Sequence, residues 1–78
     1  GKVAGSLTFT VDGTVKKVKI YIAGYKAKPA KINGTALTKF SDNGEYDVIE
    51  IDTSTNKTVN IEVTSGYRAM VNTIEFYA

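Results

Sequence analysis

Three segments of this chain alternate apolar and polar residues, a pattern that leaves little room for helices. In residues 6–11 the apolar positions are Leu7, Phe9 and Val11. Residues 17–25 and 58–64 follow a similar pattern. Because successive side chains of a β-strand point to opposite faces, a period of two predicts strands with one buried and one solvent-exposed face.

Turn signals separate these segments. Asp12-Gly13 predicts a hairpin between residues 6–11 and 17–25, because glycine tolerates the positive φ of tight turns. Asn33-Gly34 is a second strong turn signal, with a short strand through Leu37 expected after it. Asp42-Asn43-Gly44 predicts a third turn.

Two further strands are less regular. Residues 46–52 have strand character, although the adjacent Val48 and Ile49 leave the inward face open between two registers. In residues 67–77 the apolar residues fall on one face only if one residue is inserted near Asn72, which predicts a β-bulge there. The apolar residues concerned are Ala69, Val71, Ile74 and Phe76.

About seven short strands rich in Val, Ile, Thr and Tyr favour an all-β fold, either an antiparallel two-sheet β-sandwich or a small barrel. A length of 78 residues is enough for one domain spanning residues 1–78. The chain contains no Cys and no His, so stability is expected to come from packing and strand pairing.

The composition argues against several functions. Without His or Cys, the commonest catalytic base and the thiol nucleophile are missing, and the serines lie in strands or beside turns. A domain this small has little room for the cleft that a paired-carboxylate site needs. The net charge of +2 is too small to indicate nucleic acid or an anionic membrane as partner. We therefore expect that the chain is not an enzyme and that it binds neither nucleic acid nor a membrane.

One segment concentrates the oxygen ligands that calcium accepts. It comprises Asp42, Asn43, Glu45 and Asp47. The segment lacks the spacing of an EF-hand loop, and polar turn residues beside a charged strand edge also explain it. A structural calcium ion is the alternative left open.

Aromatic residues offer a second candidate site, because the apolar face of a sugar can rest on a ring while polar neighbours bind its hydroxyl groups. The carbohydrate-binding candidates are Tyr21, Tyr25, Tyr67 and Arg68. Tyr25 stands first, since it ends a strand before an irregular loop. The alternative is that these tyrosines serve only as core or rim aromatics.

Three stretches resemble small β-sandwich modules of large secreted or surface proteins of bacteria, including adhesin-like proteins and glycan-active enzymes. They are residues 5–11, residues 15–25 leading to Ile32-Asn33-Gly34, and Ser65-Gly66-Tyr67-Arg68 running into Thr73-Ile74-Glu75-Phe76. The architecture is similar to the galactose-binding-like jelly roll of many carbohydrate-binding modules. The resemblance implies a jelly-roll-like sandwich, excised from a larger multidomain protein. Such modules begin with at least one further strand, so we expect a trimmed module or an exposed sheet edge.

Two functional hypotheses follow. The first is a non-catalytic carbohydrate-binding or adhesin module that binds a polysaccharide or cell-surface glycan outside a bacterial cell, without a cofactor. The second is a structural or protein-interaction module, such as a spacer, a fibre or tail component, or an edge-strand partner of another chain.

Overall fold

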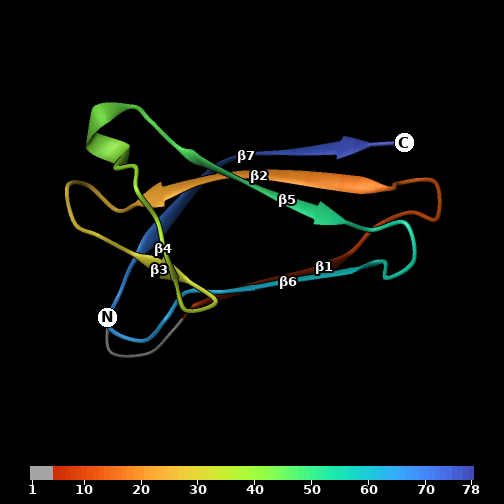
Figure 1. The fold of residues 1–78 in the computed structure, drawn as a ribbon, viewed down its shortest axis with the longest axis horizontal. Coiled ribbons are helices and arrows are strands. Elements are labelled where there is room, and N and C mark those ends of the chain that lie inside the picture. Colours follow the sequence, from red (N-terminus) through yellow and green to blue (C-terminus); the bar gives the residue numbers. More distant parts are fainter. Residues whose placement is uncertain (1–4) are drawn as a thin grey trace.

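The computed structural model describes residues 5–78, and these form mostly antiparallel β-strands with almost no helix (Figure 1). The strands are β1 (Ser6–Thr10), β2 (Lys17–Gly24), β3 (Lys31–Ile32), β4 (Thr35–Ala36), β5 (Asp47–Asp52), β6 (Thr58–Glu62) and β7 (Ala69–Tyr77). A 3₁₀-helix, η1 (Ser41–Asn43), precedes β5. The prediction of an all-β chain is confirmed.

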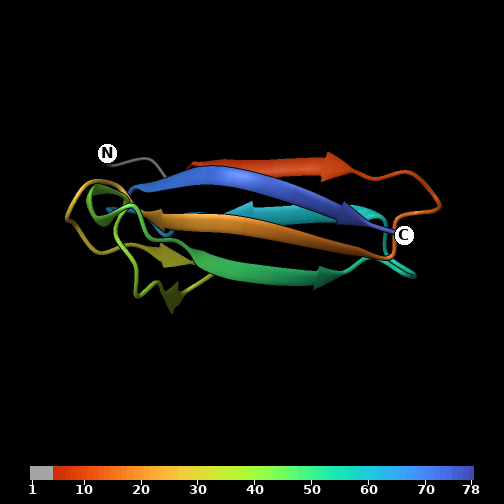
Figure 2. The same cartoon turned by 90° about the horizontal axis from the view of Figure 1, so that it is seen from above.

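The strands form three sheets, in the orders β1-β6, β5-β2-β7 and β3-β4. The β1-β6 pair faces the three-stranded sheet, as Figures 1 and 2 show from two directions. The apolar core brings together residues of both sheets and the β3-β4 hairpin: Val11, Val18, Ile20, Ile22, Ile32, Val59 and Ile61. The inward faces expected for residues 17–25 and 58–64 are therefore confirmed.

Strand pairing resolves the two registers left open for β5. Ile49 lies opposite Ile20, and Ile51 lies opposite Val18. Because directly paired residues share a face of the sheet, the two isoleucines of β5 pack against the core, while Val48 points outward and is 46% exposed.

The β-bulge expected near Asn72 is also confirmed. Tyr21 pairs with Thr73 and Ile22 pairs with Val71, so Asn72 is the extra residue of β7. The insertion keeps the apolar residues on both sides of it aligned with the inward residues of β2.

The hairpin predicted at Asp12-Gly13 is wrong, because β1 pairs with β6 whereas β2 pairs with β5 and β7. The turn instead carries the chain from one sheet to the other. The Asp12 carboxylate accepts hydrogen bonds from the backbone N–H of Thr14 (3.0 Å) and its hydroxyl (3.1 Å). Among the described glycines, positive φ occurs at Gly34, Gly44 and Gly66 but not at Gly13, so the backbone lacks the hairpin conformation.

Asn33-Gly34 does form a hairpin, between β3 and β4, with φ of 50° and 81°. Side-chain hydrogen bonds attach it to the end of β6, since the Asn33 Oδ1 accepts the Glu62 N–H (3.0 Å) and the Gly34 N–H donates to Thr64 Oγ1 (3.2 Å). This attachment places Lys31 beside the turn that leads into β7. The turn predicted at residues 42–44 is present as η1, ending at Gly44 with φ 67°.

Candidate functional site

The end of β2 and the start of β7 bring together residues that are far apart in sequence. The two strands are antiparallel, and their last pair is Gly24 with Ala69. Just beyond it, the Tyr25 N–H donates to the Arg68 carbonyl oxygen (3.1 Å). Three of the four candidate carbohydrate-binding residues, Tyr25, Tyr67 and Arg68, are thereby collected at one end of the sheet.

These residues line an open depression of about 460 Å³, which we call the tyrosine depression. Its lining consists of Tyr25, Lys26, Lys28, Pro29, Gly66, Tyr67 and Arg68. Both tyrosines are half-buried, so part of each side chain faces solvent. A half-buried ring in a concave surface can contact an apolar ligand face without first being ordered by it.

The loop that carries Tyr25 is held by its own turn and by η1. The Lys28 N–H donates to the Tyr25 carbonyl oxygen (3.3 Å), which closes the turn. The Lys26 N–H donates to Ser41 Oγ (2.7 Å), and the Asp42 N–H donates to the Lys26 carbonyl oxygen (3.3 Å). Pro29 lies in this loop outside any strand, as its missing N–H suggests.

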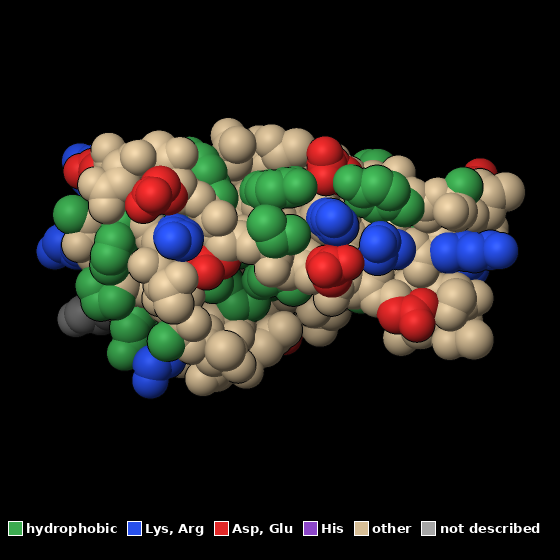
Figure 3. All heavy atoms as spheres, turned by 45° about the horizontal axis from the view of Figure 1, so that its top comes forward, with side chains coloured by type: hydrophobic (Ala, Val, Ile, Leu, Met, Phe, Trp, Pro, Cys, Tyr) green, Lys and Arg blue, Asp and Glu red, His purple; other side chains and the backbone are tan. Residues whose placement is uncertain are grey.

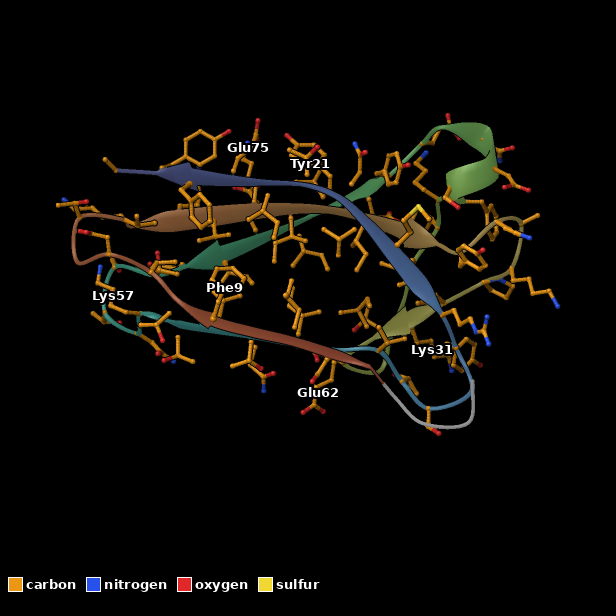
Figure 4. The ribbon with its side chains drawn as sticks, turned by 180° about the vertical axis from the view of Figure 1, so that it is seen from behind. Phe9, Tyr21, Lys31, Lys57, Glu62 and Glu75 are labelled. Carbon is orange, nitrogen blue, oxygen red and sulfur yellow. The ribbon has the colours of Figure 1, made fainter. Side chains whose placement is uncertain are left out.

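Lysine ammonium groups stand beside both rings of the depression. The Lys26 Nζ is 5.5 Å from the centroid of the Tyr25 ring, and the Lys31 Nζ is 5.6 Å from that of Tyr67. Figure 4 shows Lys31 at this end of the molecule, well away from Tyr21. Each of the two rings therefore has a positive charge next to it.

Tyr21 does not join this group. Its hydroxyl donates to Glu75 Oε1 (2.9 Å) on the outer face of the β5-β2-β7 sheet. The Tyr77 hydroxyl donates to the same oxygen (2.7 Å), and the ammonium groups of Lys17 and Lys19 lie 5.2 and 5.4 Å from the Tyr77 ring centroid. Figure 4 shows Tyr21 and Glu75 on the side of the sheet opposite Phe9.

These contacts change the acidity of the groups on the outer face. The hydrogen bond from Tyr77, and then that from Tyr21, lower the pKa of Glu75. The same bonds raise the pKa of both tyrosines. Seen from this side, acidic, basic and hydrophobic side chains are interleaved (Figure 3). Sequence reasoning missed the roles of Glu75 and Tyr77, although their spacing of two along a strand places them on one face.

The candidate calcium ligands are spread over η1, the turn after it and the first residue of β5. The Asp47 carboxylate accepts the backbone N–H groups of Thr38 (2.9 Å) and Lys39 (3.0 Å) and the Thr38 hydroxyl (2.8 Å). Burial alone would raise the pKa of Asp47, but these hydrogen bonds outweigh it and the pKa is lowered. Asn43 lies in η1, with Asp42 before it and Glu45 after Gly44. Within residues 5–78, no three His, Cys, Asp or Glu side chains are grouped so that they could hold a metal ion.

No family model, curated protein or solved structure matches this chain. Across residues 5–78 there is also no helix of sufficient length and apolarity to cross a membrane.

Proposed function

We propose that the chain is a non-catalytic, jelly-roll-like β-sandwich module that binds a polysaccharide or cell-surface glycan on behalf of a larger extracellular protein. The observation that carries the proposal is the meeting of Tyr25, Tyr67 and Arg68 in one open depression. The resemblance to bacterial carbohydrate-binding and adhesin modules agrees with it, since Tyr67 and Arg68 belong to the stretches that carry that resemblance.

The depression suits a sugar for two reasons. Tyrosine rings offer flat apolar surface, and the neighbouring Lys and Arg groups supply hydrogen-bond donors to sugar oxygens. The depression is open to solvent rather than an enclosed cavity, which fits a site that contacts one segment of a polymer.

Retention of the purified chain on insoluble polysaccharides, with a glycan array in parallel, tests the proposal. Tyr67→Ala and Tyr25→Ala should each reduce retention at least several-fold, because each removes a ring surface. Tyr77→Ala is the matched control, since it removes an exposed tyrosine on the outer face of the sheet. Thermal unfolding of each variant identifies any loss that comes from unfolding. Failure of the folded parent chain to bind any saccharide, with calcium or with a chelator, would reject the proposal.

The second candidate function is strand pairing with another chain, and the open side of β7 favours it. Within residues 5–78, β7 is an edge strand of the β5-β2-β7 sheet, because it pairs only with β2. Its inward residues Phe76 and Val71 remain 55% and 40% exposed, although Phe76 also packs edge-to-face on Phe9 of β1 at 6.1 Å. Figure 2 shows β1 and β7 along the same side of the molecule. An added strand there would cover apolar surface that is now in water.

A further inference from the structure

We infer that the tyrosine depression takes an acidic saccharide, one bearing carboxylate or sulfate groups, rather than a neutral one. This inference rests on the proposed function and specifies its ligand class. The cationic residues Lys26, Lys28 and Arg68 are among the seven lining residues, and none of the seven is acidic. Lys31 adds a further ammonium group beside Tyr67.

Hydrogen-bond chemistry argues for the same ligand class. A neutral sugar presents hydroxyl groups that donate as well as accept, so a site for it normally supplies acceptors. Lysine and arginine only donate, and the side-chain acceptors of the lining are limited to the hydroxyl groups of Tyr25 and Tyr67. A carboxylate or sulfate group only accepts, and it therefore matches a donor-rich lining.

Arg68 is the residue best placed to recognise the anion. Its backbone carbonyl oxygen accepts the Tyr25 N–H, which holds the root of the side chain at the rim of the depression. The guanidinium fork can form two parallel hydrogen bonds with a carboxylate or sulfate group, whereas Lys28 contributes a point charge. The Lys26 ammonium beside the Tyr25 ring lets a sugar contact the ring and a cation together.

A second hollow at the other end of β2 shows that this charge pattern is not general. It is lined by Lys16, Lys17, Glu50, Ile51, Asp52 and Ser54, so cations and carboxylates are mixed there. Near the tyrosine depression, Asp42 contacts Lys26 through its backbone N–H but does not line the depression. Of these two hollows, the tyrosine depression is therefore the one whose lining has an excess of positive charge.

The test compares binding of polygalacturonate, dextran sulfate and neutral dextran by titration at rising NaCl concentration. Both acidic polymers, or one of them, should bind more tightly than dextran, and affinity should fall steeply up to about 0.5 M NaCl. Preference between the two acidic polymers identifies carboxylate or sulfate as the recognised group.

Arg68→Gln should weaken acidic-polymer binding about tenfold, and Arg68→Lys should retain part of that binding. Lys16→Gln, which removes the same charge at the far end of β2, should stay within about twofold of the parent chain.

The outcomes separate the inference from the proposed function. Binding of neutral saccharides as tightly as acidic ones, without salt dependence, would overturn the inference and leave the carbohydrate-binding function standing. Equal losses in Arg68→Gln and Lys16→Gln would also overturn it, because the attraction would then be non-specific. Tighter binding of a single-stranded oligonucleotide than of either acidic polymer would do the same. Absence of binding to every saccharide would reject the function itself.

Discussion

At Gly24 the chain leaves β2 and turns back so closely that a side chain has no space. A Cβ atom at this position would collide with the carbonyl oxygen of Lys28. The same glycine donates its N–H to the Lys39 carbonyl oxygen (3.0 Å) and is buried. The turn that presents Tyr25 therefore depends on the absence of a side chain one residue earlier.

Gly24→Ala is expected to lower the free energy of unfolding by about 1–3 kcal/mol, because the backbone of the loop must move to relieve the overlap. Denaturant unfolding measures the change. Gly13→Ala is the control, since nothing lies within 4 Å of a Cβ there and its φ is not positive. Equal effects of the two substitutions would contradict the role assigned to Gly24.

Asp47 provides a second prediction at the residue scale. Asp47→Ala removes the acceptor of three hydrogen bonds from Thr38 and Lys39. We expect a loss of about 1–3 kcal/mol in the free energy of unfolding. Asp42→Ala, at an exposed position in η1, should change stability little. Stabilisation of the parent chain by added calcium that both substitutions abolish would argue for a bound cation instead.

Within residues 5–78, one edge of β7 pairs with no other strand, and its sequence is not typical of an edge strand. It spans nine residues without Lys or Pro, the residues that commonly discourage edge pairing. Two features of the strand disfavour such pairing, the bulge at Asn72 and the charged side chain of Glu75. On its open side, Val71 and Phe76 leave apolar surface in contact with water.

Val71→Lys is expected to reduce association between chains, because a charge would be buried at the edge on pairing. Sedimentation velocity across a range of concentrations measures the effect. Val48→Lys adds the same charge on the outer face of β5, and it should leave association closer to that of the parent chain. A parent chain that stays monomeric at all concentrations would contradict self-pairing through β7.

The whole molecule has neither disulfides nor His, so its pH dependence comes from hydrogen-bonded carboxyl and phenol groups. The pKa of Asp12 is lowered by hydrogen bonds from Thr14, and that of Asp52 by hydrogen bonds from Ser54. The pKa of Asp47 and that of Glu75 are lowered as well. A lowered folded-state pKa gives stability that is fully present above the ordinary pKa and is lost as pH falls from there through the folded-state pKa.

We therefore expect the melting temperature to decline as pH falls below about 4.5 and again as it rises above about 10, with a plateau between. The alkaline decline follows because the pKa values of Tyr21 and Tyr77 are raised, so their protonated forms are favoured in the folded chain. Thermal unfolding across this pH range measures both limbs. Glu75→Gln should make both the acid and the alkaline decline of the melting temperature smaller, since Glu75 takes part in the hydrogen bonds behind each. A parent and a Glu75→Gln variant with identical profiles would contradict this assignment.

The strands and their inward faces could be read from the sequence because they depend on local periodicity. The alternation around Val18, Ile20 and Ile22 requires one buried face, and the broken phase at Asn72 requires a bulge wherever the strand is paired. The conformation at Asn33-Gly34 is similarly local, since those two residues tolerate positive φ.

Tertiary structure decided which strands pair and which side chains meet. Asp12-Gly13 has the composition of a hairpin, yet β1 pairs with β6, because pairing depends on long-range burial of both sheets rather than on the turn alone. Tyr21 and Tyr25 are close in sequence but lie in different places. Tyr21 is on the outer face of the β5-β2-β7 sheet, and Tyr25 lies beyond the end of β2. Tyr67 and Arg68 reach Tyr25 only because β7 runs antiparallel to β2. Local pattern determined the elements, while chain topology determined the site.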